Sequence, residues 1–413
     1  MHMAKRKADQ KADLEVVIDR EEVPSLMEPL LIGEESRHRA SLTDLAFELA
    51  QKSAGLRRSL PETVVSSLAG LVRSMNCYYS NLIEGHNTHP IDIERALKGD
   101  YSTDAKKRDL QLEAKAHISV QEWLDEGGSS GHPASSEVIR DIHRRFCSEL
   151  PSALLKVEDP VTKEIVEVVP GELRHRDVMV GRHVSVSPAA VPRFLARFEQ
   201  VYGRLGKTET IISAAAAHHR LLWIHPFLDG NGRVARLMSH AMLRTTLDTG
   251  AIWSVARGLA RRVDEYKGHL AACDLKRRND LDGRGNLSEE NLAKFIRFFL
   301  EVCLDQVAFM EELMQPDRLR ARILRWAADE TQLGNLEENS GALLEALLYR
   351  GEVPRGDVQA ITGTGDRQAR RVAAALIGQG VITSESSRAP LRLAFPAAVA
   401  PRWMPGLFPE KPE

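Results

Sequence analysis

Residues 225–236 read HPFLDGNGRVAR, a polar, glycine-containing stretch between two apolar helical patterns. The segment AAAAHHRLLWI comes directly before it, and a second helical pattern begins at Arg233. This arrangement predicts a loop that joins two helices. Unpaired backbone N–H groups at the amino end of a helix lie at the positive end of its dipole and receive phosphate. We therefore expect Gly230, Asn231 and Gly232 to form an anion-binding loop, to which the Asn231 amide adds a donor.

Four further side chains of this stretch suit a nucleoside triphosphate. Asp229 can hold Mg²⁺, because this ion prefers one carboxylate plus phosphate oxygens to an all-protein cage. Arg233 and Arg236 lie three residues apart, so they share a helix face and offer two guanidinium groups to the phosphate chain. His225, with an ordinary pKa of about 6.5, can take a proton from an attacking hydroxyl at neutral pH. These residue types predict a nucleotide site with a general base.

The stretch matches H-x-F-x-[DE]-G-N-G-R-x-x-R at every specified position and resembles the signature of the Fic family. Eight fixed residues coincide by chance at about one in 10¹⁰ per starting point on flat residue usage. The resemblance implies a mostly helical fold that transfers AMP from ATP to a hydroxyl side chain of a target protein, with Mg²⁺ as the metal. Carried over by position, His225 would deprotonate the target Tyr, Thr or Ser, and Asp229 would hold the metal. Residues 230–233 would bind phosphates, and Arg236 would contact the γ-phosphate.

A second segment, 163–188, departs from the helical pattern. Its sequence, KEIVEVVPGELRHRDVMVGRHVSVSP, alternates valine with other residues and is punctuated by glycine, which predicts a β-hairpin. Residues 170–186 resemble the flap of Fic proteins, a ribbon that covers the nucleotide and holds the target segment. An exposed ribbon edge can pair with an extended peptide through main-chain hydrogen bonds. The resemblance places Val180, Gly181 and Arg182 near the nucleotide; the alternative is a plain surface hairpin.

Residues 80–85, SNLIEG, match the [ST]-x-x-x-E-[GN] pattern of the inhibitory helix found in many Fic proteins. The pattern, which begins at Ser80, ends a predicted helix and precedes the Fic motif, as in family members that carry inhibition in the same chain. On this resemblance we expect Glu84 to pair with Arg236 and to occupy the guanidinium that should hold the γ-phosphate. The resting enzyme would then be weakly active. A glutamate near a helix end is otherwise usually solvated.

Tyr266, in the sequence RRVDEYKGHL, lies where Fic proteins often place an aromatic residue near the adenine. The family commonly has a second tyrosine beside it, whereas this chain has Lys267. A tyrosine at helical spacing also fits a core position. Tyr266 is therefore a candidate nucleotide contact, with a core role as the alternative.

Helical spacing dominates the rest of the chain, which predicts an all-α fold: a Fic-type helical bundle with a β-hairpin flap, followed by a small winged-helix domain. Helices are expected over 62–82, 106–124, 136–148, 188–205, 208–224 and 289–314. Near the carboxyl end, helical segments are expected at 340–350, 355–362 and 366–379, before a ribbon within 381–395. The expected parts are an N-terminal segment (1–60), a catalytic core (61–309), a helical linker (310–339) and a winged-helix-like domain (340–413).

Composition excludes several classes of protein. The 413 residues are 43% hydrophobic and 28% charged, which is ordinary for a globular chain and unlike collagen or a disordered protein. The net charge of −2 gives no overall attraction to nucleic acid or to an anionic membrane. No apolar run approaches the roughly 18 residues of a membrane span, and the four cysteines show no C-x-x-C spacing. We expect a cytoplasmic protein with no membrane partner.

Alternatives to AMP transfer remain open. Another Fic-type transfer, of phosphate or of a different nucleotide, would use the same motif, although the intact GNGR glycines favour AMP. A DNA-binding regulator with a nucleotide-sensing Fic domain would contact phosphates through arginines of the C-terminal domain. These are Arg367, Arg370, Arg371, Arg388 and Arg392. That domain could instead serve a homodimer or recruit the target protein, and self-modification is a further expected reaction.

Overall fold

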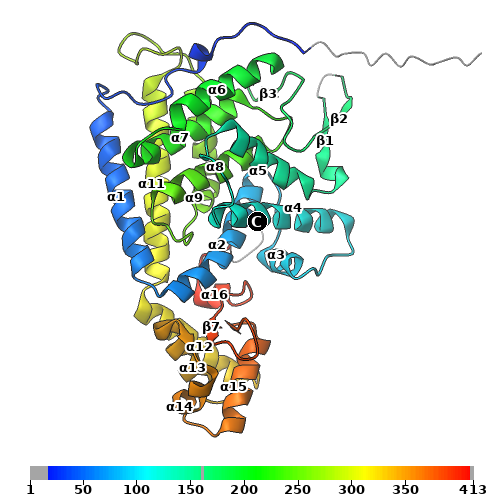
Figure 1. Cartoon of the computed structure of the whole chain (residues 1–413), viewed down its shortest axis with the longest axis vertical. Coiled ribbons are helices and arrows are strands. Elements are labelled where there is room, and N and C mark those ends of the chain that lie inside the picture. The colour runs from blue at the N-terminus through cyan, green and yellow to red at the C-terminus, as the bar shows by residue number, and fades with distance from the viewer. Residues whose placement is uncertain (1–16, 160–161, 410–413) are drawn as a thin grey trace, which may run out of the picture.

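The computed structural model describes residues 17–159 and 162–409, and most of them are helical (Figure 1), which confirms the all-α prediction. The α-helices are α1 (Arg39–Arg58), α2 (Glu62–Ile83), α3 (Pro90–Leu97), α4 (Ala105–Asp125), α5 (Ser136–Ser148), α6 (Val191–Tyr202), α7 (Lys207–Ile224), α8 (Asn231–Thr246), α9 (Val255–Arg261), α10 (Val263–Cys273), α11 (Glu289–Leu313), α12 (Pro316–Gln332), α13 (Ser340–Arg350), α14 (Val358–Thr362), α15 (Asp366–Gly378) and α16 (Ala400–Trp403). The 3₁₀ helices are η1 (Pro24–Met27), η2 (Ser152–Leu155), η3 (Pro188–Ala190) and η4 (Arg355–Asp357). The strands are β1 (Lys156–Glu158), β2 (Ile165–Glu167), β3 (Met179–Val180), β4 (His183–Val184), β5 (Glu352–Val353), β6 (Ile382–Thr383) and β7 (Leu391–Leu393).

Helices α7 and α8 form the centre of the upper lobe, which we define as residues 17–313 (Figure 1). They pack against each other; α11, α6 and α1 also contact α7, and α5, α4 and α2 contact α8. The four alanines at 214–217 of α7 are fully buried, as expected for a helix that is apolar on most of its faces. The loop between α7 and α8 therefore joins two helices that the core holds in place.

Most predicted helices are present at close to their expected bounds. The main differences lie at helix starts. The segment expected as one helix over 188–205 is η3 followed by α6, which ends before Gly203. Helix α8 begins at Asn231, two residues before the expected start, because Gly230 at its N-cap adopts φ 79°, a left-handed conformation that favours glycine.

The predicted β-hairpin is present but short. Strands β3 and β4 pair antiparallel, with Met179 opposite Val184 and Val180 opposite His183. The residues of the 170–186 segment that precede β3 form no strand. Strands β1 and β2 form a second, antiparallel pair that the sequence analysis did not predict.

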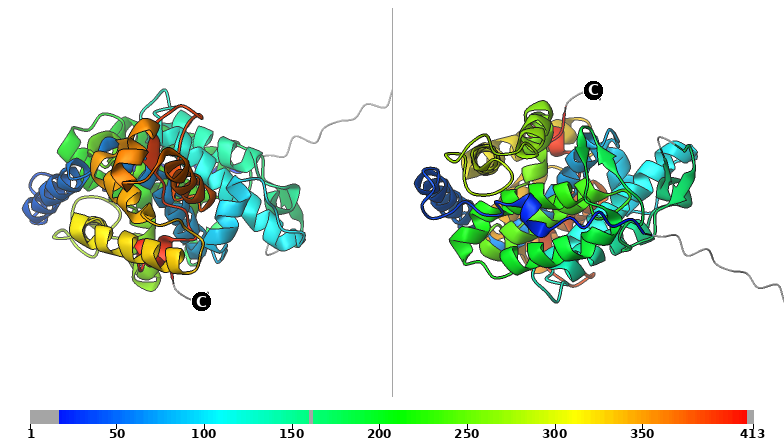
Figure 2. Two further views of the ribbon diagram at one scale, coloured as in Figure 1. Left: turned by 90° about the horizontal axis from the view of Figure 1, so that it is seen from below. Right: turned by 90° about the horizontal axis from the view of Figure 1, so that it is seen from above.

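The N-terminal segment runs across the upper lobe near α6 and the base of the flap (Figure 2, right). Ala189 donates its N–H to the carbonyl of Ile18 over 3.1 Å. Tyr202 of α6 donates its hydroxyl to the carbonyl of Leu30 over 2.7 Å. These contacts tie residues 17–30 to the bundle. Within the described part of the chain, none of the helices combines the length and apolar content that crossing a membrane requires.

The lower lobe, residues 316–408, contains the helices and ribbon expected near the carboxyl end (Figure 1). Strands β6 and β7 pair, and β5 pairs with the other edge of β7, which gives the strand order β5-β7-β6. Helix α12 packs against α13 and α16. The assignment of this lobe as a winged-helix domain, and of 310–339 as a linker, stay predictions.

Leu407 and Phe408 contact helix α2 of the upper lobe. The Tyr79 hydroxyl donates to the carbonyl of Leu407 over 3.2 Å. The Tyr78 ring meets the Phe408 ring edge-on, with 5.9 Å between centroids. The two lobes therefore meet on α2, the helix that directly precedes Glu84.

We expect Trp403 to contribute strongly to the stability of the lower lobe. It is fully buried and meets Trp326 edge-on, with 5.3 Å between ring centroids. We expect Trp403→Ala to lower the free energy of unfolding by about 3–5 kcal/mol, since it removes a buried aromatic side chain. Tyr349→Ala, at a residue that is 51% exposed in the same lobe, is the control and should stay within about 0.5 kcal/mol. Denaturant unfolding of the full chain, followed by circular dichroism, compares them; equal effects would contradict this role.

Candidate active site

A cavity of about 1110 Å³ opens beside the motif loop. Its walls come from the end of α2, the β3–β4 hairpin, the carboxyl half of α7, the start of α8, and α10 with the residues that follow it. Ligand cavities are typically about 300–1000 Å³, so this one has room for a nucleoside triphosphate. Parts of the chain that lie far apart in sequence build one site.

The cavity brings together most of the predicted site residues. Those on its wall are Glu84, Val180, Gly181, Arg182, His225, Gly232, Arg236 and Tyr266. The remaining ones are Ser80, Asp229, Gly230, Asn231 and Arg233, which belong to the layer behind the wall or to the loop beside it. Sequence spacing alone does not separate these two groups.

His225 is held in a special backbone conformation at the end of α7. Its φ of 53° is left-handed, a region that histidine enters more readily than most residues. Nδ1 lies 3.3 Å from the carbonyl oxygen of Leu222. Because a carbonyl can only accept, Nδ1 carries the proton in this contact, which leaves Nε2 able to accept one. Burial, and then the guanidinium of Arg174, lowers the pKa of His225 to about 4, so the imidazole is neutral at pH 7.

Asn231 braces the motif loop. Its side-chain oxygen accepts from the N–H of Phe227 over 3.0 Å, and its NH₂ donates to the carbonyl of the same residue over 2.8 Å. The ring of His143 stacks on the Phe227 ring, with 3.9 Å between centroids, and its Nδ1 accepts from the N–H of Gly171. The Asn231 amide is thus engaged with the loop itself rather than placed on the cavity wall, a difference from the expected phosphate donor.

Arg233 is fixed behind the cavity by a buried carboxylate. It is 5% exposed, and its Nη2 forms an ion pair with Glu113, which is 2% exposed. The other oxygen of Glu113 lies 2.7 Å from Nδ1 of His86. This hydrogen bond raises the pKa of His86 above its ordinary value. Neither Glu113 nor His86 belongs to a motif that the sequence reveals.

Arg236 pairs with Glu84, as expected from the inhibitory pattern, and it also contacts Ser80. Its Nη2 lies 2.5 Å from an oxygen of Glu84, and its Nε donates to the Ser80 hydroxyl over 2.9 Å. Burial acts to raise the pKa of Glu84, but the charges of Arg236 and Arg233 outweigh it and hold this pKa below its ordinary value. A Cβ at Gly232 would lie 2.3 Å from the Glu84 carboxylate. The start of α8 therefore lets this carboxylate approach only because residue 232 lacks a side chain.

Asp229 is an exposed carboxylate, and the described residues give it no hydrogen bond or ion pair. No group of three His, Cys, Asp or Glu side chains that could hold a metal occurs among residues 17–159 and 162–409. One free carboxylate still fits Mg²⁺, which takes its other ligands from phosphate and water. The donor set thus suits a metal that arrives with the nucleotide.

Tyr266 lies at the boundary between the cavity and the core. It lies on the cavity wall, yet it is 2% exposed, and its hydroxyl lies 2.6 Å from Nε2 of His218. Nδ1 of His218 in turn lies 2.9 Å from the Ser239 hydroxyl. Burial raises the pKa of Tyr266 to about 12, so the phenol is neutral. Lys267, the departure from the family pattern, lies on the same wall.

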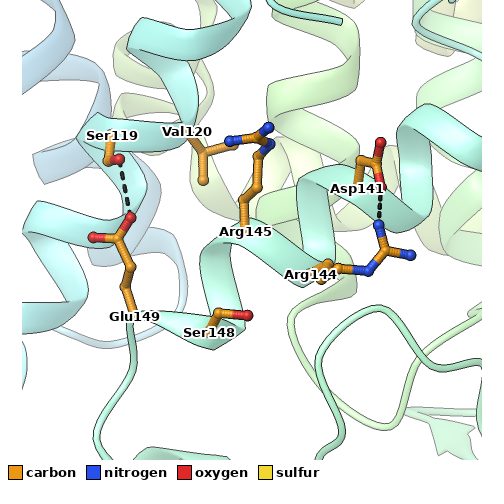
Figure 3. Close-up of a pocket in the computed structure, with 7 residues that line it drawn as sticks. All are labelled: Ser119, Val120, Asp141, Arg144, Arg145, Ser148 and Glu149. Atoms are coloured by element: carbon orange, nitrogen blue, oxygen red, sulfur yellow. Dashed lines mark hydrogen bonds and ion pairs between the residues drawn. The ribbon is translucent and has the colours of Figure 1, made fainter.

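A smaller cavity of about 320 Å³ lies between α4 and α5 (Figure 3). Arg144 pairs with Asp141 there, and the Ser119 hydroxyl donates to Glu149. None of the motif residues lines it. It adds nothing to the chemistry of the motif cavity.

Most arginines that could contact DNA are engaged with carboxylates. Arg370 pairs with Asp366, and Arg371 pairs with Glu337. Arg392 contacts two glutamates, Glu352 and Glu385. These neighbouring negative charges oppose a phosphate-binding face.

Comparison with known proteins agrees with the geometry. Residues 133–243 match the Fic/DOC family. The protein named "Protein adenylyltransferase Fic" of Drosophila erecta is 25% identical over 205 residues, which are 49% of this chain and 37% of that protein. Its counterpart in Drosophila ananassae is also 25% identical over 205 residues, with 49% and 36% covered. The matched region is therefore under half the length of these curated relatives.

A solved structure shares the fold. The crystal structure of a Fic family protein from Desulfovibrio desulfuricans G20 aligns with a TM-score of 0.50 at 16% identity, and the alignment covers 88% of this chain and 98% of that one. The family match runs from the start of α5 through the motif into α8, and so includes the flap. Residues 133–243 are therefore similar to the Fic/DOC family, and the chain shares the helical fold of a solved Fic family protein.

Proposed function

We propose that this protein is an adenylyltransferase that moves AMP from ATP to a Tyr, Thr or Ser hydroxyl of a target protein, and that Glu84 restrains it. One observation carries the proposal: His225, with Nε2 able to accept a proton, and Arg236 lie on the wall of the same nucleotide-sized cavity. Relatives named adenylyltransferases support it. The cavity wall thus offers a base for the target hydroxyl and a cation for the phosphates of ATP.

The reaction needs little from the protein beyond alignment and charge. Nε2 of His225 takes the proton from the target hydroxyl as the oxygen attacks the α-phosphorus. A new oxygen–phosphorus bond forms, the bond from the α-phosphorus to the bridging oxygen breaks, and pyrophosphate leaves. The Nδ1–H bond to Leu222 keeps the imidazole in the tautomer that can accept this proton.

The phosphate chain would lie against the start of α8. The backbone N–H groups of residues 230–232 lie at the amino end of that helix, which is the positive end of its dipole. Arg236 adds a guanidinium. Asp229 would hold Mg²⁺, which when bound neutralises charge on the phosphates. Gly232 permits close approach at this point, as the position of Glu84 already illustrates.

The target segment would dock on the hairpin. Met179 and Val184 are 67% and 60% exposed, and the two-residue strands leave their outer edges unpaired in the described chain. An extended peptide can add to such an edge by main-chain hydrogen bonds, which would present its hydroxyl to the cavity. Modification of a second copy of this chain would use the same geometry.

Glu84 restrains the enzyme, in this proposal, because it occupies the guanidinium that the γ-phosphate needs. The pair with Arg236, together with the two Ser80 contacts of that arginine, holds the side chain against α2. ATP would then bind with its phosphates misplaced for attack. Relief would require Glu84 to leave Arg236.

Differently labelled ATP tests the kind of transfer. The full chain, with Mg²⁺ and a cell lysate, should take up label from [α-³²P]ATP and none from [γ-³²P]ATP, because pyrophosphate carries the γ-phosphate away. Uptake of γ-label alone would show phosphate transfer, the other reaction that the motif could serve. No uptake of either label by wild type and Glu84→Gly would favour a nucleotide sensor. Washing under denaturing conditions before counting is the control for bound nucleotide.

A further inference from the structure

A buried arginine of the flap segment, Arg174, connects the flap to the turn that carries His225. Its side chain is 2% exposed, although the cavity wall does not include it. A buried guanidinium needs hydrogen bonds to offset the loss of water. The partners of Arg174 are backbone carbonyl groups from two separate segments.

The first segment is the end of α7. Nε of Arg174 donates to the carbonyl of His225 over 2.7 Å, and Nη2 lies 3.4 Å from the carbonyl oxygen of Ile224. The main chain adds a third link, because the N–H of Arg174 donates to the carbonyl of Pro226 over 3.0 Å. Three successive residues of the catalytic turn are therefore held by one residue of the flap segment.

The second segment is the base of the flap. Nη1 donates to the carbonyl of Arg176 over 2.9 Å, and Nη2 donates to the carbonyl of Val186. These two residues flank the β3–β4 hairpin on either side. His183 within the hairpin gives a further tie, since its Nε2 lies 2.8 Å from the carbonyl of Trp223. The hairpin and the His225 turn thus form one hydrogen-bonded unit.

We propose that Arg174 is a positioning residue for AMP transfer, which sets the His225 imidazole and the flap-bound target at a fixed separation. The left-handed backbone of His225 gives this role a physical reason, because surrounding contacts stabilise a non-glycine residue in that conformation. The planar five-donor fork of arginine can serve carbonyl groups from both segments at once, whereas a lysine ammonium is a point charge. The charge of Arg174 also faces His225, together with His183 and Asp229.

One substitution separates the hydrogen-bonding geometry of the Arg174 guanidinium from its positive charge. Arg174→Lys keeps the charge and should lower kcat by about 100-fold, the usual effect of misplacing a reacting group by about 1 Å. The KM for ATP should change by less than about threefold, because Arg174 does not line the cavity. Arg140→Lys is the matched control, since Arg140 donates to the carbonyl of Gly171 in the same segment but has no bond to the His225 turn. An equal kcat loss in the two lysine variants, or a loss confined to KM, would overturn the proposal.

A titration of His225 without nucleotide gives a readout that does not rest on the proposed function. In histidine-labelled full chain, NMR should show the His225 midpoint moving upward in Arg174→Gln, which removes the charge, and staying close to wild type in Arg174→Lys. If the titration midpoint of His225 were the same in Arg174→Gln as in wild type, the contact between Arg174 and the His225 turn would be contradicted. A shifted midpoint with no AMP transfer in any variant would instead count against the proposed function alone. If a variant fails to fold, the wild type alone gives a test. The Nε–H proton of Arg174 should exchange slowly with solvent, and fast exchange would contradict its hydrogen bond to the His225 carbonyl.

Discussion

Glu84→Gly is expected to raise AMP transfer by about 10- to 100-fold at saturating MgATP. The estimate follows from a charge-assisted pair of about 1.5–3 kcal/mol, at about 1.4 kcal/mol for each factor of ten. The Glu84 side chain is 32% exposed, which favours the lower part of this range. Removing the carboxylate frees Arg236 for the γ-phosphate, so the gain should appear mainly in the rate of transfer rather than in tighter binding of ATP.

The chain offers a close control for this substitution. Glu126 is the C-cap of α4 with φ −83° and ψ 0°, almost the same as the C-cap Glu84 of α2 with φ −83° and ψ −1°. Its side chain is exposed and lies outside the cavity. Glu126→Gly should therefore leave the rate unchanged, while Glu84→Gln should reproduce part of the gain because it removes the charge and keeps the shape. A rate in Glu84→Gly equal to that of wild type would refute the restraint.

His225→Ala, made in the Glu84→Gly background, is expected to lower AMP transfer by about 10²- to 10⁴-fold, the usual contribution of a general base. ATP binding should survive, since Arg236 and the start of α8 are untouched. His175→Ala is the control: this histidine belongs to the flap segment, pairs with Glu172 and lies outside the cavity. A rate within a few-fold of the parent would mean that another group takes the proton.

The pH profile gives a further check on this base. Because burial lowers the pKa of His225 to about 4, the imidazole is neutral and competent above that value. The kcat/KM, which reports the free enzyme, should stay level from pH 7 down to about 5 and should fall as pH drops through about 4. Returning samples to pH 7 and recovering full activity would exclude acid denaturation as the cause. A fall centred between pH 6 and 7 would contradict a half-buried, neutral base.

Local patterns in the sequence predicted many of the helices and the hairpin, and they singled out eight residues that lie on the cavity wall. The Fic motif fixed the loop between α7 and α8, and the pattern at Ser80 and Glu84 anticipated the contact with Arg236. These features could be found because their residues are close in sequence or belong to a known signature. Helix α8 begins two residues before the expected start, because Asn231 and Gly232 belong to the helix and not to the loop.

The supporting residues could not be found in the same way. Glu113 and Arg233 are 120 residues apart in the sequence, and Arg174 is 51 residues from His225, whose carbonyl it contacts. Hydrogen bonds from side chains to distant carbonyl groups require no repeating pattern, so neither residue stands out in the sequence. Asn231 was correctly placed in the motif, but only the folded loop shows that its amide engages Phe227.

The most direct test of this account is intact and peptide mass spectrometry after incubation with MgATP, alone and with a cell lysate. Wild type, Glu84→Gly and Glu84→Gly combined with His225→Ala are compared. We expect an AMP-sized mass gain on hydroxyl side chains that is small in wild type, larger in Glu84→Gly and absent when His225 is also replaced. A phosphate-sized gain in place of AMP, or an AMP-sized gain that is unaffected by both substitutions, would contradict it.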